Sequence, residues 1–167
     1  MKTAIILGTS RQDGNTTKLV NLYQEKVKAD LFNLNDYVVS PFDYNHLNKD
    51  DDFLPLIKEL LCYESLIIAS PIYWYSMSAQ MKVFFDRLSD LLSIEKDLGR
   101  KLRGKDFSVL ATGVDKIPPD CFEKAFELSA KYLGMIYKNM FYCSCEEQFI
   151  KKEHDVKLIN YIRANVA

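Results

Sequence analysis

The sequence predicts an α/β protein whose five parallel strands form a doubly wound sheet in the order 2-1-3-4-5. Two observations lead to this prediction. Five short apolar runs, each of strand length, alternate along the chain with segments of helical periodicity. The length of 167 residues fits one domain spanning residues 1–167. Right-handed crossovers then place helices on both faces of the sheet.

The five strands are expected where an apolar run ends in glycine or in polar residues. The expected ranges are 2–8, 30–34, 65–70, 107–112 and 135–143. The second range is short, so we expect it at an edge of the sheet. The third, Leu66-Ile67-Ile68-Ala69, is apolar throughout, which is typical of a strand buried on both faces.

Helices are expected between the strands, where apolar residues recur at helical spacing. The expected ranges are 16–29, 53–63, 77–92 and 120–133, with a last helix inside 146–166. Gly134 is expected to end the fourth helix as a left-handed cap. Residues expected on the inner faces include Ala125 and Ser129 in the fourth helix and Val156, Ile159, Ile162 and Val166 in the last.

Polar residues outside these faces are interpreted as solvent-exposed. The stretch 35–52 is expected to be a long surface loop, in which Asp51 or Asp52 caps the next helix. His46 and His154 are expected in solvent, and Asp90 is expected away from the apolar face of its helix. The stretch 94–104 is expected to be a connection.

The overall charge and the apolar runs exclude several function classes. A net charge of −1, from 22 basic and 23 acidic residues, gives no general attraction to nucleic acid or to acidic membranes. No apolar run approaches the length of a membrane span, and the N-terminal run is too short for a signal peptide. We therefore expect a cytoplasmic protein with reduced cysteines and no metal site.

The segment Gly8–Thr17, GTSRQDGNTT, follows the first strand and precedes the first helix. The free N–H groups and the dipole of a helix N-terminus favour an anion. Hydroxyl, amide and guanidinium donors suit a terminal phosphate, and they come from Ser10, Arg11, Asn15, Thr16 and Thr17. The glycine spacing of dinucleotide-binding loops is absent. An ordinary capped loop is the alternative interpretation.

A second unusual segment, Ser70–Ser76, follows the third strand and reads SPIYWYS. In the expected strand order, the direction in which the chain adds strands reverses between strands one and three, so this loop and the first one meet at one edge. Flat aromatic surface and backbone N–H groups beside a phosphate site together favour flavin mononucleotide (FMN). An aromatic cluster that seals the end of the sheet is the alternative.

These two segments resemble motifs of the NAD(P)H-dependent FMN reductase family, which has the flavodoxin-like fold. The family motifs are G-S-x-R-x-x-G-N-T and P-x-Y-x-x-S-x-x-x-x-K-x-x-x-D-R, and residues 8–17 and 70–87 resemble them. The resemblance implies an FMN flavoprotein, an oxidoreductase that transfers hydride from NAD(P)H to FMN N5. The electrons then pass to free flavin, a quinone, an azo or nitro compound, or a metal complex. A homodimer is also implied.

The resemblance assigns roles to individual residues. It implies that the phosphate is held by Ser10, Arg11, Asn15, Thr16 and Thr17. It implies that the ring is held by Pro71, Ile72, Tyr73, Trp74 and Ser76, with Thr112 and Gly113 at its far edge. Tyr75 stands where the family often has glycine, and it would cover one flavin face. Hydride transfer between two cofactors needs stacking and distance, so no catalytic acid or base is expected.

Alternatives remain at this stage. A flavodoxin-type FMN electron carrier without its own substrate turnover shares the fold, but the longer phosphate loop and the weak net charge do not favour it. Related iron–sulfur flavoproteins carry a cysteine cluster before strand three, and residues 37–61 contain no cysteine. A domain that kept the fold without binding flavin is the third alternative. Lys82, Asp86 and Arg87 form either an exposed ion pair or a brace beneath the flavin loop.

Overall fold

A central sheet of five parallel strands organises the molecule. The computed structural model describes residues 1–146 and 148–165. The strands are β1 (Thr3–Leu7), β2 (Asp30–Asn33), β3 (Ser65–Pro71), β4 (Asp106–Gly113) and β5 (Ile136–Ser144). Their order is β2-β1-β3-β4-β5, and every neighbouring pair is parallel. The predicted sheet and strand order are therefore confirmed.

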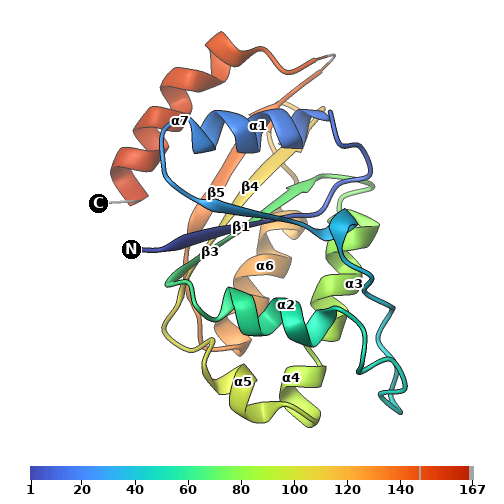
Figure 1. Cartoon of the computed structure of the whole chain (residues 1–167). Coiled ribbons are helices and arrows are strands. Elements are labelled where there is room, and N and C mark those ends of the chain that lie inside the picture. Colours follow the sequence, from blue (N-terminus) through green and yellow to red (C-terminus); the bar gives the residue numbers. More distant parts are fainter. Residues whose placement is uncertain (147, 166–167) are drawn as a thin grey trace.

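Helices cover both faces of the sheet (Figure 1). The helices α1 (Asn15–Gln24) and α7 (Lys151–Asn165) pack on one face. The other face carries α2 (Phe53–Leu60), α3 (Ala79–Arg87) and α6 (Asp120–Tyr132). Short helical segments are η1 (Leu34–Asp36), α4 (Asp90–Ser93) and α5 (Lys96–Arg100). In the part of the chain that the structure describes, no helix is long and apolar enough to cross a membrane.

Burial follows the position of each strand in the sheet. Every residue of β1 and β3 is buried, as expected for central strands covered on both faces. The edge strand β2 leaves Leu31 exposed, while Phe32 faces the core. Gly134 has φ +75° after α6, which confirms the predicted left-handed cap.

The predicted helix 77–92 is broken in two. Helix α3 ends at Arg87 and α4 begins at Asp90. Both side chains are fully buried, and Arg87 Nε donates to Asp90 Oδ2 at 2.8 Å. The expectation that Asp90 lies away from the core was wrong because this ion pair turns both charged groups inward. The expected connection 94–104 contains the short helix α5.

The inner faces of two helices also differ from the prediction. In α7, Val156 is exposed, and the buried positions are His154 and Leu158. His154 is thus not in solvent: its ring lies 5.0 Å from that of Phe149, and burial lowers its pKa. In α6, Ala125 is exposed and Ala130 is buried instead. The predicted inner residue Val166 lies outside the described residues.

Arg87 holds the long loop 37–52 against α3 and α4. Its Nη1 lies 2.5 Å from Asp51 Oδ2 and donates to the Ser40 carbonyl at 3.0 Å. Asp51 also accepts from the backbone N–H groups of Ser40 and Phe53, at 2.9 and 3.0 Å. Of the two predicted caps, Asp52 occupies the N-cap position of α2, while the side chain of Asp51 bonds the first N–H of the helix and is an ion-pair partner as well. Burial raises the pKa of Asp51, but these hydrogen bonds outweigh it, so its pKa is below the ordinary value.

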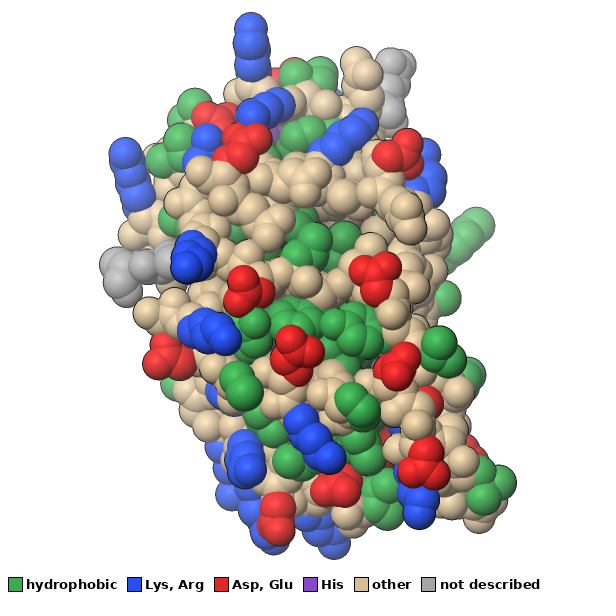
Figure 2. Space-filling model, viewed as in Figure 1, with side chains coloured by type: hydrophobic (Ala, Val, Ile, Leu, Met, Phe, Trp, Pro, Cys, Tyr) green, Lys and Arg blue, Asp and Glu red, His purple; other side chains and the backbone are tan. Residues whose placement is uncertain are grey.

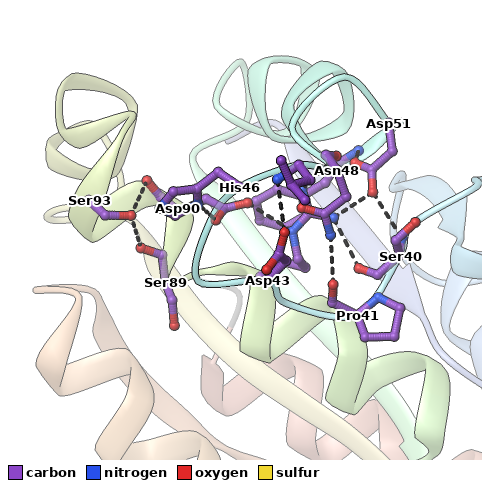
Figure 3. Close-up of polar contacts among 12 residues, drawn as sticks. Ser40, Pro41, Asp43, His46, Asn48, Asp51, Ser89, Asp90 and Ser93 are labelled. Atoms are coloured by element: carbon purple, nitrogen blue, oxygen red, sulfur yellow. Dashed lines mark hydrogen bonds and ion pairs between the residues drawn. The ribbon is translucent and has the colours of Figure 1, made fainter.

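The same network includes His46 (Figure 3). His46 Nδ1 lies 2.9 Å from Asp90 Oδ1, and the imidazole is half-buried rather than solvated. The amide of Asn48 donates to the Pro41 carbonyl at 2.6 Å, which closes the loop on itself. We call Arg87, Asp51, Asp90, Ser40 and His46 the Arg87 network.

Candidate functional site

The loops after β1, β3 and β4 meet at the carboxyl edge of the sheet, on the right in Figure 1. They enclose a cavity of about 210 Å³. Its walls are Thr9, Arg11, Gly14, Asn15, Thr16, Pro71, Ile72, Tyr73, Thr112, Gly113, Val114 and Cys145. The expectation that the polar loop and the aromatic loop converge is therefore confirmed.

One wall of the cavity is the N-terminus of α1. The N-cap residue Gly14 is extended, with φ −70° and ψ 173°. Among the described residues, no side chain caps this end of the helix. The N–H groups of the first turn are consequently available to an anion, and the helix dipole adds partial positive charge there. Arg11, also in the wall, adds a full positive charge.

A tight turn, Tyr73–Ser76, follows the aromatic wall of the cavity, and Tyr73 is its one residue in that wall among the described residues. Tyr73 N–H donates to the Ser76 carbonyl at 2.9 Å, and Ser76 N–H returns a bond to Tyr73 at 3.0 Å. The two central residues, Trp74 and Tyr75, have φ of +50° and +64°. A two-residue turn with both central residues left-handed is type I′, which usually contains glycine or asparagine. A glycine would therefore adopt the conformation of position 75 without strain.

The turn also determines which backbone donors remain for a ligand. The N–H of Ile72 donates to the Thr112 carbonyl at 2.8 Å, and those of Tyr73 and Ser76 are used within the turn. In the described part of the chain, the N–H groups of Trp74 and Tyr75 have no hydrogen-bond partner. Trp74 is 93% exposed and Tyr75 65% exposed, so both side chains extend into solvent.

Buried side chains join the first loop to α3. Ser78 Oγ donates to the Gly8 carbonyl at 2.8 Å and accepts from Met81 N–H at 3.2 Å, so it also caps α3. Ser70 Oγ accepts from Ser78 N–H at 3.1 Å. A Cβ on Gly8 would lie 2.9 Å from Met81 Cβ, so only glycine permits this approach. Sequence reasoning missed these contacts, because it placed Ser78 inside the expected helix 77–92 rather than at the N-cap of α3.

The end of β4 forms the third wall. Thr112 Oγ1 lies 2.7 Å from Thr16 Oγ1, and both residues are buried. A Cβ on Gly113 would lie 2.8 Å from Tyr142 Oη, so a larger residue there would displace the tyrosine. Cys145 donates its N–H to the Gly113 carbonyl at 2.7 Å, and burial raises the pKa of its thiol.

The structure divides the predicted site residues into two groups. Arg11, Asn15, Thr16, Pro71, Ile72, Tyr73, Thr112 and Gly113 line the cavity. Ser10, Thr17, Trp74, Tyr75 and Ser76 do not, although all are close to lining residues in the chain. Sequence reasoning missed Thr9, Gly14, Val114 and Cys145. Their only available signal was proximity in sequence to the two motifs or to the end of a strand.

The charged residues on one face of the molecule are of both signs. On the face shown in Figure 2, basic and acidic side chains are interspersed. Lys82 and Asp86 form an exposed ion pair at 2.6 Å, so the surface-pair interpretation holds for them, whereas Arg87 belongs to the buried network. In residues 1–146 and 148–165, no group of three or more His, Cys, Asp or Glu side chains is arranged to hold a metal ion.

The match to known proteins decides the family. A family model described as NADPH-dependent FMN reductase matches residues 1–147. The chain belongs to the NADPH-dependent FMN reductase family. YwqN of Bacillus subtilis, described by its name as an NAD(P)H-dependent FMN-containing oxidoreductase, is 32% identical over 148 residues, covering 83% of this chain and 82% of YwqN.

Two further proteins are similar to this member of the NADPH-dependent FMN reductase family. An iron–sulfur flavoprotein of Methanocaldococcus jannaschii is 28% identical over 128 residues, which cover 70% of this chain and 64% of the relative. The solved structure of the Trp repressor binding protein from Bacillus subtilis superimposes with a TM-score of 0.78 at 25% identity, covering 99% of this chain and 98% of that one. The flavodoxin-like fold, the enzyme class, FMN as cofactor and NAD(P)H as reductant are confirmed.

The cavity fits this cofactor. An uncapped helix N-terminus beside Arg11 suits a phosphate. The unpaired N–H groups of Trp74 and Tyr75, which follow the wall residue Tyr73 in the chain, suit the polar edge of a ring. Small-molecule sites are usually larger than about 300 Å³, so a cavity of 210 Å³ would enclose only part of FMN. The rest of the ligand would remain open to a second substrate at the rim.

Proposed function

We propose that this chain transfers hydride from NAD(P)H to N5 of FMN and then passes the electrons to a second small molecule. The acceptor classes are free flavin, a quinone, an azo or nitro compound, or a metal complex. The observation that carries the proposal is one cavity with a phosphate-type helix N-terminus in one wall and Tyr73, the first residue of the aromatic turn, in another. The family to which the chain belongs supports the same reaction.

The phosphate end of the site is assigned to the loop after β1. The N–H groups at the start of α1, the Arg11 guanidinium and the Thr16 hydroxyl would bind the phosphate oxygens, with Asn15 beside them. Ser10 and Thr17 are the remaining predicted donors, and ligand binding would have to bring them closer. This loop contributes affinity and orientation, and it takes no part in proton transfer.

The ring end is assigned to the loops after β3 and β4. The backbone N–H groups of Trp74 and Tyr75 would donate to the ring edge on which negative charge develops during reduction. Pro71, Ile72 and Gly113 would exclude water from one side of the ring. The Tyr75 side chain, 65% exposed, is free to cover the other face and so to restrict how nicotinamide stacks.

The test is spectroscopic and uses the purified full-length chain. We expect a yellow protein that releases FMN on denaturation, and we expect NADH or NADPH to bleach it under anaerobic conditions. A flavin that stays oxidised with both nucleotides would refute the enzyme and leave the electron carrier. A colourless protein that binds no added FMN would refute both functions.

We also propose that the chain forms a homodimer through the surface around the cavity. Large apolar side chains of the two loops after β3 and β4 are exposed there: Tyr73, Trp74, Tyr75, Val114 and Ile117. Covering such a surface is favourable, and exposed apolar groups in proximity often mark an interface. Sedimentation equilibrium of the FMN-loaded protein is expected to give twice the chain mass of 19.4 kDa. A monomer at micromolar concentration would contradict this proposal.

A further inference from the structure

We propose that Thr112 is a phosphate-positioning residue that acts through Thr16. This inference rests on the proposed FMN site. It assigns the Thr112 side chain to the phosphate end of the cavity, whereas the family resemblance implies a place at the far edge of the ring. The starting observation is the 2.7 Å contact between the two hydroxyl oxygens, made by residues 96 positions apart in the chain.

A count of hydrogen-bond donors shows what this pair lacks. Each threonine hydroxyl has one proton, and a contact between two hydroxyls uses one proton of the two. Thr16 and Thr112 are 2% and 3% exposed, so water reaches neither freely. Within residues 1–146 and 148–165, neither hydroxyl has another partner. One proton of the buried pair therefore lacks an acceptor, and both residues line the cavity.

The position of Thr16 indicates which hydroxyl faces the ligand. Thr16 is the second residue of α1, beside the free N–H groups of the helix N-terminus. Thr112 lies near the end of β4, with its carbonyl already bonded to Ile72 N–H. The arrangement that satisfies both protons has Thr112 donating to Thr16 and Thr16 donating to a phosphate oxygen. A hydroxyl that accepts one hydrogen bond also donates a stronger one.

Thr112 also fixes the rotamer of Thr16. A threonine side chain has several staggered rotamers, which point its hydroxyl in different directions. The contact with Thr112 selects the rotamer that faces β4 and the cavity. Without it, the Thr16 hydroxyl is free to turn back toward the chain, and the phosphate loses a donor.

Comparison of FMN with riboflavin, which lacks the phosphate, tests this inference. Apo-protein is titrated with each flavin, and binding is followed by quenching of flavin fluorescence. For Thr112→Val we expect about tenfold weaker FMN binding, the usual size for a lost hydrogen bond to a charged group. Riboflavin binding should stay the same within about twofold. Thr112→Ser should restore FMN affinity.

Two controls separate positioning from folding. Thr3→Val alters another buried threonine, at the opposite end of β1, and should leave the ratio of FMN to riboflavin affinity unchanged. In a Thr16→Val background, adding Thr112→Val should weaken FMN binding no further, because the donor through which Thr112 acts is already gone.

Three results would overturn the inference. Thr112→Val would weaken both flavins equally if Thr112 contacts the ring, and would weaken neither if the hydroxyl pair is only structural. The effects of Thr16→Val and Thr112→Val would multiply if the two hydroxyls act independently. A wild-type chain that binds neither flavin would refute the proposed function itself, and this inference with it.

Discussion

Replacing Arg87 by methionine tests the buried ion pairs that hold the loop 37–52. The guanidinium has no exposed surface, and it contacts carboxylates of Asp51 and Asp90 that are themselves almost buried. Methionine has a similar length and fills the space without charge. Arg87→Met therefore leaves two carboxylates in the interior without their cation.

The magnitude follows from this burial. Removing one partner of a buried ion pair costs about 3 to 5 kcal/mol, because the remaining charge is desolvated and unpaired. With an unfolding slope of roughly 2 kcal/mol per molar urea, the urea midpoint should fall by about 1.5 to 2.5 M. Arg87→Met with Asp51→Asn and Asp90→Asn should recover part of this loss, since buried amides cost less than buried carboxylates.

Equilibrium urea unfolding at pH 7, followed by circular dichroism, measures the effect. Arg100→Met is the matched control: Arg100 pairs with Asp97 at 2.7 Å, but both side chains are mostly exposed, so its midpoint should not change measurably. A midpoint for Arg87→Met within about 0.5 M of wild type would show that the network contributes little, and the reasoning from burial would be wrong.

Three further predictions follow from the same structure. The pKa of the Asp51 carboxyl is lower in the folded state than in the unfolded state. The carboxylate therefore stabilises the fold fully above the unfolded-state pKa of about 3.9, and this stabilisation is lost as the pH falls through the folded-state pKa. Asp51→Asn should therefore lose less stability than wild type between pH 6 and pH 2 (roughly the window in which carboxylates titrate) in urea unfolding. Gly8→Ala would place a Cβ 3.0 Å from the Met81 backbone nitrogen. The thermal midpoint of this variant should fall by an amount equivalent to about 1 to 3 kcal/mol. An unchanged midpoint would mean that α3 shifts away without cost and that the close approach does not require glycine. Tyr75→Gly should be neutral or stabilising by about 1 kcal/mol, because φ is +64° at this position, whereas Tyr75→Val should destabilise the protein. If urea unfolding found the valine variant more stable than the glycine variant, the type I′ turn would be contradicted.

The sheet could be predicted from sequence because its signal is local. The run Leu66–Ala69 and the runs of the other strands are apolar and short, and the alternation with helices leaves few possible topologies. The two site loops followed from the same logic, since each comes directly after a strand whose position was clear. Their convergence is a property of the strand order.

The errors at Asp90, His46 and His154 have one physical origin: polar residues were assigned to solvent. Arg87 and Asp51 are 36 residues apart, and nothing in one sequence indicates that their charges meet inside the protein. His154 packs on Phe149 and takes an inner position of α7 that a purely apolar pattern gives to Val156. Side chains with an aromatic or aliphatic body and a polar end are buried when a partner satisfies that end, and the partner is usually remote in sequence.

The cavity illustrates the same principle at the site itself. Each loop that forms a wall is held by a group from another segment: Gly8 by Ser78, Thr9 by Asn35, and Ile72 by Thr112. These bonds join side chains or backbone of one loop to backbone of another, so they leave no motif of their own. The geometry of the cavity therefore depends on residues such as Ser78 and Asn35 that do not line it. A substitution there is expected to act on flavin affinity through the loops, because a buried carbonyl that loses its donor will move to find another.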